Sequence, residues 1–210
     1  MERQFLSGKT LAFGVSLLQR IAVPTDPGYA DLVKPGAPQA LVMCPTRELA
    51  LQVTRDLADA SSVRRARVLT VYGGVGYESQ LETLTDGVDV VVGTPGRLLD
   101  LANRRSLDLS QVKVLVLDEA DEMLDLGFLP DVERLIAKTP KSRETLLFSA
   151  TMPAAIVALA RMHLNQPVNV RAETHDALRD SDVWRVVKLT DYTGCARPDA
   201  ALVKKGRTTS

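Results

Sequence analysis

The chain has 210 residues, of which 45% are hydrophobic and 25% are charged. This length suffices for one sizeable domain with a filled core but is short for two. The 26 basic and 26 acidic side chains cancel, so no overall positive field indicates nucleic-acid binding, and such a site would have to be a local patch. The sequence contains no run of about 18 apolar residues, which argues against a membrane span. The cytoplasm is therefore the expected compartment.

Strand-like apolar runs alternate with helical patterns along most of the chain. The first helical pattern covers residues 9–21, and a surface loop rich in Pro and Gly follows at 24–38. Strands are then expected at 40–44, 68–72, 88–93, 112–117 and 145–148. Helices are expected at 47–60, 79–85, 96–103, 129–138 and 154–163. This alternation is typical of an α/β fold with a mainly parallel sheet and helices on both faces.

The pattern weakens beyond about residue 172. A short strand is expected at 168–170, and residues 183–189 are compatible with one more. Residues 192–210 are typical of a polar, poorly ordered tail. We therefore expect one domain over residues 1–172 and a linker or tail over 173–210.

The segment Ser7-Gly8-Lys9-Thr10 matches the end of a phosphate-binding loop that opens a helix. Free N–H groups of the helix and the Lys9 ammonium would meet phosphate charge, and the Thr10 hydroxyl would ligate Mg²⁺. A helix cap is the alternative for this motif taken singly. The full loop pattern places a glycine at position 3, where this chain has Arg3, and residues 3–6 contain no glycine. We therefore expect an incomplete phosphate cradle and a missing N-terminal strand.

The apolar run at 112–117 ends at Asp118-Glu119-Ala120-Asp121. An acidic residue at the carboxyl end of a buried parallel strand lies where open α/β sheets bind their ligands. Asp118 would hold the same Mg²⁺ through water, and Glu119 would orient or deprotonate the attacking water. A solvated helix start is the alternative reading of these acidic residues alone.

These motifs and four others occur in the order found in DEAD-box ATP-dependent RNA helicases, and the chain resembles the first RecA-like domain of that family. The resemblance covers roughly residues 7–172. The motifs that carry it are Ser7-Gly8-Lys9-Thr10, Pro45-Thr46-Arg47-Glu48-Leu49-Ala50, Gly73-Gly74, Thr94-Pro95-Gly96-Arg97, Asp118-Glu119-Ala120-Asp121 and Ser149-Ala150-Thr151. The resemblance implies ATP and Mg²⁺ as cofactors, and single-stranded or duplex RNA as partner.

The resemblance assigns RNA-backbone contacts to three of these motifs, through Pro45, Thr46, Arg47, Gly73, Gly74, Thr94, Pro95, Gly96 and Arg97. Thr94 suits a helix N-cap and Pro95 the first helical position, so free N–H groups there can receive a phosphate. Arg47 and Arg97 can add charge-assisted contacts. Such contacts set position without reading sequence. A capped helix with a turn is the alternative for each motif alone.

The resemblance also implies that Ser149 and Thr151 hydrogen-bond towards Asp121 and couple ATP hydrolysis to strand separation. A strand end with a cap is the alternative here. The family's second RecA-like domain, its arginine finger and its adenine-recognising segment have no counterpart in the sequence. We therefore expect weak ATPase activity and no unwinding from this chain alone.

Two other functions compete with a helicase fragment. The first is a non-catalytic module that keeps the fold and binds RNA weakly, with salt-sensitive affinity that does not depend on Mg-ATP. The second is another phosphate-binding-loop enzyme, such as a nucleotide kinase. Residues 94–97 and 149–151 have no evident role in a kinase, so we set that reading aside.

Overall fold

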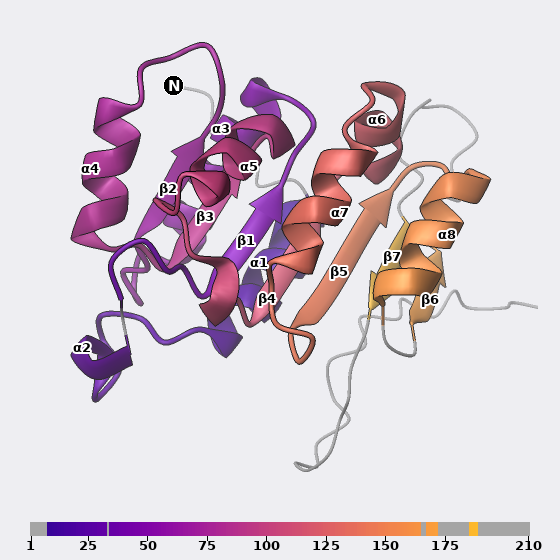
Figure 1. Ribbon diagram of the computed structural model, residues 1–210. Coiled ribbons are helices and arrows are strands. Elements are labelled where there is room, and N and C mark those ends of the chain that lie inside the picture. The colour runs from indigo at the N-terminus through magenta and orange to yellow at the C-terminus, as the bar shows by residue number, and fades with distance from the viewer. Residues whose placement is uncertain (1–7, 33, 165–166, 172–184, 189–210) are drawn as a thin grey trace, which may run out of the picture.

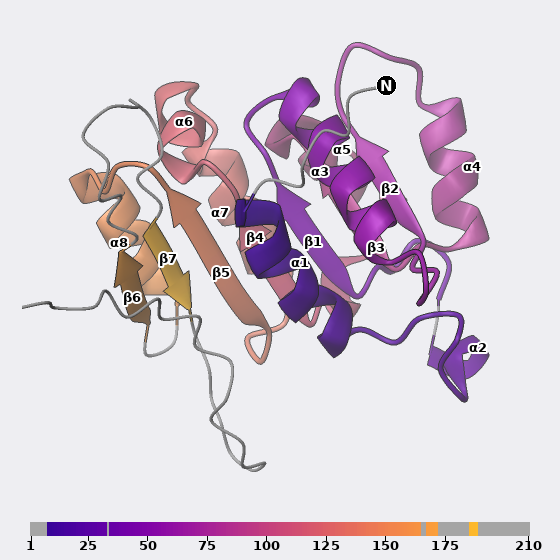
Figure 2. The same cartoon turned by 180° about the vertical axis from the view of Figure 1, so that it is seen from behind.

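The computed structural model of the chain describes residues 8–32, 34–164, 167–171 and 185–188. Within these ranges a single sheet crosses the molecule and helices cover both of its faces (Figure 1, Figure 2). The strand order is β2-β3-β1-β4-β5-β7-β6. The strands are β1 (Ala40–Met43), β2 (Val68–Val71), β3 (Val90–Gly93), β4 (Val114–Leu117), β5 (Glu144–Ser149), β6 (Val168–Arg171) and β7 (Arg185–Lys188).

The first five strands in this order are mutually parallel, as the alternation of strands and helices predicts. Strand β7 pairs antiparallel with both β5 and β6. It lies inside the expected tail of residues 173–210, and the rest of that tail lies outside the described residues. The backbone of this short segment therefore belongs to the sheet.

Helices α1 (Gly8–Arg20) and α3 (Arg47–Ala60) cover one face of the sheet. The opposite face carries α4 (Glu78–Asp86), α5 (Pro95–Asn103), α6 (Ala120–Asp125), α7 (Leu129–Ala137) and α8 (Ala154–His163). The short helices α2 (Tyr29–Leu32) and η1 (Leu109–Gln111) lie in the connections. None of the described helices is long and apolar enough to cross a bilayer.

Successive side chains of the central strands point to opposite faces of the sheet, so the core consists of two layers. In β1, Ala40 and Val42 pack with α1 and α3, whereas Leu41 and Met43 pack beneath the helices of the other face. All four side chains are fully buried. A strand that is buried on both faces needs a continuous apolar sequence, which explains why Val and Leu runs predict these strands.

Helix α1 runs antiparallel to the strands beneath it. Arg20, at its last turn, forms an ion pair with Glu144 at the start of β5. Nearer the start of α1, the ring of Phe13 packs edge-on against Phe148 near the end of β5, with ring centroids 5.3 Å apart. The first turn of α1 therefore lies at the edge of the sheet where the parallel strands end.

The strand boundaries differ from the sequence expectation by one or two residues. Strand β3 begins at Val90 rather than Val88, and β4 begins at Val114 rather than Val112. Helix η1 ends just before Val112, whose N–H bonds back to Leu109. Val88 and Val112 are buried in the core although they do not pair in the sheet. Their apolar side chains therefore extend the apolar runs beyond the strands themselves.

Candidate functional site

The carboxyl ends of the five parallel strands meet at one edge of the sheet, which we call the carboxyl edge. Strands β2, β3 and β1 end there side by side, followed by β4 and β5. The predicted motifs come directly after these strand ends or, for residues 8–10, lie at the start of α1. Sheets of this kind bind ligands outside the carboxyl ends of their strands.

One half of the carboxyl edge is formed by the start of α1 and the end of β4. Gly8 and Lys9 lie in the first turn of α1, and Ser7 and the residues before it lie outside the described ranges. The Thr10 side chain is buried, and so is that of Asp118. The Asp118 N–H bonds to the Met43 carbonyl at 3.0 Å, which extends the pairing of β1 and β4 past the last strand residue. The fold thereby fixes the backbone from which the Asp118 carboxylate projects.

These residues fit a Mg²⁺–nucleotide. Free N–H groups at a helix start attract phosphate oxygens. Among the residues that the structure describes, no group of three or more His, Cys, Asp or Glu side chains could hold a metal by itself. Mg²⁺ does not require one, because it is commonly held by one or two carboxylates together with substrate phosphates and water. The hydroxyl of Thr10 and the carboxylate of Asp118 are oxygen ligands of the kind Mg²⁺ prefers.

Glu119 has a left-handed backbone, with φ 54° and ψ 54°. It is the N-cap residue of α6, but its side chain makes no capping hydrogen bond. A left-handed conformation costs a residue with a β-carbon roughly 1–2 kcal/mol. Residues held in such conformations cluster at active sites. The turn of the chain between β4 and α6 therefore sets the direction of the Glu119 side chain at an energetic cost.

Hydrogen bonds join the first turn of α6, which follows β4, to the end of β5. The Asp121 N–H donates to the Ser149 hydroxyl at 3.1 Å. Thr151 donates to the Asp121 carboxylate from both its N–H and its hydroxyl, at 2.8 Å each. The Ser149 hydroxyl in turn donates to the Thr151 carbonyl at 2.6 Å. These bonds close a network of three residues that connects two neighbouring strands.

The other half of the carboxyl edge carries the motifs after β1, β2 and β3. The Thr46 hydroxyl caps α3 by accepting the Leu49 N–H at 3.2 Å. Thr94 is the N-cap of α5, with Pro95 at the first helical position, but the Thr94 side chain makes no capping bond. Thr94 therefore occupies the expected N-cap position without a side-chain bond, whereas Thr46 forms a cap that was not expected. The first turn of α5 consequently keeps N–H groups that a ligand can use.

Open space surrounds the glycines of these motifs. A β-carbon at Gly73, Gly74 or Gly96 would meet no other atom within 4 Å. Gly74 has a φ of 82°, a conformation that favours glycine. The backbone here is accessible to a ligand that approaches closely.

Gly73, Tyr77, Thr94, Gly96, Arg97, Asp100 and Phe128 line a hollow of about 440 Å³. Arg97 lies at its wall, with its guanidinium over the Tyr77 ring, 4.1 Å from the ring centroid. Its Nη2 donates to the Val75 carbonyl at 2.8 Å. Four residues of this lining belong to the predicted RNA motifs. Tyr77 and Asp100 were not expected from the sequence.

The spacing along α5 could have indicated the missed residues. Arg97, Asp100 and Arg104 are separated by three and four positions, so they share one face of a helix. The Tyr77 hydroxyl bonds to Asp100, and Arg104 Nε donates to the same carboxylate at 3.0 Å. These two bonds lower the pKa of Asp100. The partner of this face, Tyr77, comes from another segment and cannot be read from α5 alone.

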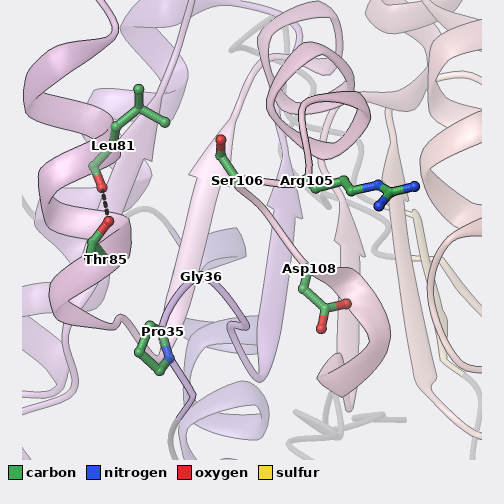
Figure 3. A pocket seen from close by; sticks show the side chains of 7 residues that line it. All are labelled: Pro35, Gly36, Leu81, Thr85, Arg105, Ser106 and Asp108. Carbon is green, nitrogen blue, oxygen red and sulfur yellow. Dashed lines mark hydrogen bonds between the residues drawn. The ribbon is translucent and has the colours of Figure 1, made fainter.

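A second hollow, of about 240 Å³, lies at the opposite end of the strands, where the chain enters β1 (Figure 3). Pro35, Gly36, Leu81, Thr85, Arg105, Ser106 and Asp108 line it. In Figure 3 the Arg105 side chain points away from Leu81 and Thr85. The Asp108 carboxylate caps η1 by accepting the Ser110 N–H at 2.9 Å. This hollow contains none of the residues that the sequence singles out.

Comparisons with known proteins agree with this arrangement. The model of the DEAD/DEAH box helicase family matches residues 6–159. The DEAD-box ATP-dependent RNA helicase CshA of Geobacillus kaustophilus is 44% identical over 170 residues, which are 81% of this chain and 34% of the relative. The ATP-dependent RNA helicase DeaD of Escherichia coli K12 is 48% identical over 169 residues, 80% of this chain and 25% of the relative. The chain thus spans about a quarter to a third of these relatives.

Solved structures show the same fold. A DEAD box protein from the hyperthermophile Methanococcus jannaschii superposes with a TM-score of 0.68 and 36% identity, covering 79% of this chain and 42% of that one. The yeast DEAD-box splicing factor Prp28 gives a TM-score of 0.67 and 35% identity, covering 76% and 37%. The RecA-like α/β fold expected from the sequence is therefore confirmed. With its family model matched over more than half of its length, the chain belongs to the DEAD/DEAH box helicase family.

Proposed function

We propose that the chain binds Mg-ATP and single-stranded RNA side by side at the carboxyl edge, as the first-domain part of an ATP-dependent RNA helicase. One observation carries this proposal. The start of α1, Asp118 and the network of Asp121 lie on the same edge as the open helix start after Thr94. Both ligands are polyanions, and each half of the edge offers a helix N-terminus to receive one.

In the nucleotide half, each residue has a distinct role. Ser7, Gly8 and Lys9 would face the phosphates, with the Lys9 ammonium placed against the β- and γ-phosphate charge. Thr10 and Asp118 would hold Mg²⁺, the latter through water, and the ion neutralises charge on the phosphates when bound. The Glu119 carboxylate would accept a proton from the attacking water or orient it. The αL backbone of Glu119 supports this role, because residues held in such conformations cluster at active sites.

In the RNA half, the contacts are to the sugar–phosphate backbone. Thr46 and Arg47 at the start of α3, the Gly73-Gly74 turn, and residues 94–97 at the start of α5 would line the path of one strand. Neighbouring strand ends lie about 4.7–4.9 Å apart in a sheet, so motifs on β2, β3 and β1 can follow successive phosphates. Affinity should be salt-dependent and indifferent to base sequence.

The Asp121–Ser149–Thr151 network would couple ATP hydrolysis to strand separation. It begins three residues after Asp118 and ends beyond β5, so a change at the nucleotide can move the segment after Ser149. Its bonds join the first turn of α6 to the residues that follow β5. These bonds support the coupling role that we propose for the three residues.

We further propose that the 210-residue chain by itself hydrolyses ATP slowly and does not unwind duplexes. An arginine finger contributes about 10³- to 10⁵-fold to the hydrolysis rate in related nucleotide enzymes, and the family's arginine finger has no counterpart in this sequence. A non-catalytic RNA-binding module is the second candidate. The absence of glycine from residues 3–6, where the phosphate loop should approach the nucleotide closely, favours it.

A titration with a fluorescent ATP analogue separates the two candidates. The wild-type chain should bind the analogue saturably with Mg²⁺ and more weakly with a chelator. Lys9→Ala should weaken binding at least about tenfold, because a hydrogen bond to a charged group contributes about 1.5–3 kcal/mol. Lys138→Ala is the matched control, since Lys138 is exposed at the end of α7. Equal and negligible binding by wild type and Lys9→Ala would leave the RNA-binding module as the function.

A further inference from the structure

Two arginines of the predicted RNA half stack on tyrosines of one loop. Residues 72–77 connect β2 to α4, and we call them the Tyr72–Tyr77 loop. The guanidinium of Arg47 lies over the Tyr72 ring at 4.7 Å from the centroid. That of Arg97 lies over the Tyr77 ring at 4.1 Å. The loop that carries Gly73-Gly74 therefore also carries an aromatic platform at each end.

The Tyr77 ring makes more contacts with its surroundings than the Tyr72 ring does. Arg104 also lies over its ring, at 4.5 Å. The Tyr77 hydroxyl bonds to Asp100, and Arg104 Nε bonds to the same carboxylate at 3.0 Å. Arg97, Asp100 and Arg104 all belong to α5 or its C-cap. Several independent contacts thus fix the ring against one face of α5.

The position of Arg97 depends on few other contacts. Its Nη2 donates to the Val75 carbonyl, which belongs to the same loop. Its Nη1 has no hydrogen-bond partner among the described residues. The side chain of an arginine has many rotamers to lose when it binds a phosphate, and stacking on an aromatic face restricts them beforehand. Arg97 also lines the hollow with Thr94 and Gly96, where a phosphate would enter.

We propose that Tyr77 is a positioning residue, which holds the Arg97 guanidinium at the wall of this hollow so that it meets an RNA phosphate with little further loss of freedom. The inference rests on the proposed RNA binding at the carboxyl edge. Tyr77 acts through Arg97 and does not itself contact the nucleic acid. The aromatic face is the part that matters, because it supplies the attraction to the cation. The hydroxyl fixes the ring through Asp100 and is secondary.

The test measures affinity of the full chain for a fluorescein-labelled single-stranded oligouridylate by anisotropy, over a series of salt concentrations. Tyr77→Leu should weaken binding about two- to fivefold, the range that a partly exposed cation–π contact supports. Tyr77→Phe keeps the ring and should stay within about twofold of wild type. Arg97→Ala should weaken binding further and lower the slope of log affinity against log salt by about one. Tyr77→Leu should keep the wild-type slope, since the arginine still reaches its phosphate.

A double variant tests whether Tyr77 affects RNA affinity through Arg97. If Tyr77 acts through Arg97, then Tyr77→Leu should have no added effect in the Arg97→Ala background. Tyr29→Leu is the matched control: the Tyr29 ring also carries an arginine, Arg67 at 5.4 Å, and its hydroxyl bonds to Asp89 at 2.5 Å. Those residues lie at the opposite end of the strands. Tyr29→Leu should therefore leave RNA affinity unchanged while changing stability.

The outcomes separate this inference from the function on which it rests. If Arg97→Ala binds RNA as wild type does, the proposed RNA site at this edge is wrong. If Arg97→Ala weakens binding but Tyr77→Leu does not, the positioning role alone is overturned. Equal losses from Tyr77→Leu in the wild-type and Arg97→Ala backgrounds would also overturn it, because the ring would then act independently of the arginine. A loss from Tyr77→Phe as large as that from Tyr77→Leu would assign the effect to the hydroxyl instead.

Discussion

Thr151 donates two hydrogen bonds to the Asp121 carboxylate, from its N–H and from its hydroxyl, both at 2.8 Å. Burial raises the pKa of Asp121, but the bonds from Thr151 and Ser149 outweigh it and hold the pKa below its ordinary value. The fold therefore favours the charged carboxylate. A network built on that charge connects the first turn of α6, three residues after Asp118, to the end of β5 at Ser149.

The pH dependence of stability should report this carboxylate. Because the folded-state pKa of Asp121 lies below the unfolded value of about 3.9, its contribution is present above about pH 4 and is lost as the pH falls through the folded value. Asp121→Asn removes the titration. In urea unfolding, the free-energy difference between wild type and Asp121→Asn should grow as pH rises towards about 4 and then stay level. Thr151→Val lacks one of the two bonds, so the free-energy difference between wild type and Thr151→Val should rise less with pH. A difference between wild type and Asp121→Asn that is the same at every pH would contradict the account.

The left-handed backbone of Glu119 should reverse the usual ranking of Ala and Gly. At a φ of 54° a β-carbon is strained and glycine is not. Glu119→Gly should therefore be more stable than Glu119→Ala by about 1 kcal/mol in urea unfolding. At Glu122, exposed within α6, the order should be the ordinary one, with Ala more stable by about 0.5–1 kcal/mol. If Ala is the more stable variant at both positions, the conformation assigned to Glu119 is wrong.

Gly93, the last residue of β3, should not tolerate a side chain. A β-carbon there would overlap the Val71 carbonyl oxygen and also press on Leu98. Gly93→Ala should lower the free energy of unfolding by about 1–3 kcal/mol, the usual cost of overpacking a core. Gly96→Ala is the control, because it lies in a helix with open space around it and should be neutral or up to about 1 kcal/mol stabilising. Thermal or urea unfolding of both variants measures these changes in stability. A Gly93→Ala chain as stable as wild type would refute the close approach of Gly93 to the Val71 carbonyl.

Tyr29 should be detectable by its titration in alkali. Burial, together with its hydrogen bond to the Asp89 carboxylate, raises the pKa of Tyr29 to about 12. Its neutral form stabilises the fold below the ordinary pKa of about 10, and this contribution is lost as pH rises towards the folded value. The near-ultraviolet absorbance of phenolate should show a phase near pH 12. Tyr29→Phe should remove that phase, and Tyr72→Phe should leave it in place.

Much of the fold could be predicted because the central strands are buried on both faces. The apolar run before Asp118 has no other place in a soluble domain than the middle of a covered sheet. Helix α3 could be placed because apolar residues recur along it at helical spacing, and of these Ala50, Val53 and Leu57 are buried. In both cases the residues that determine the strand or helix are close together in the sequence.

Other features depend on segments that are distant in sequence. Helix α6 has only six residues, too few for an apolar period to stand out. The stacking of Arg97 on Tyr77 requires α5 to lie against the loop after β2. Pairing of β7 with β5 joins residues about forty positions apart, through backbone groups that carry no sequence signal. These contacts arise from the assembled sheet and could not be found one motif at a time.

Photo-crosslinking tests the central claim most directly. A thiouridine-substituted single-stranded RNA would be irradiated with the full chain, and the crosslinked peptides mapped by mass spectrometry. We predict crosslinks within residues 45–47, 73–76 and 94–97, at the carboxyl ends of β1, β2 and β3. Crosslinks confined to the opposite end of the strands, at residues 34–39 and 105–113, would contradict the account.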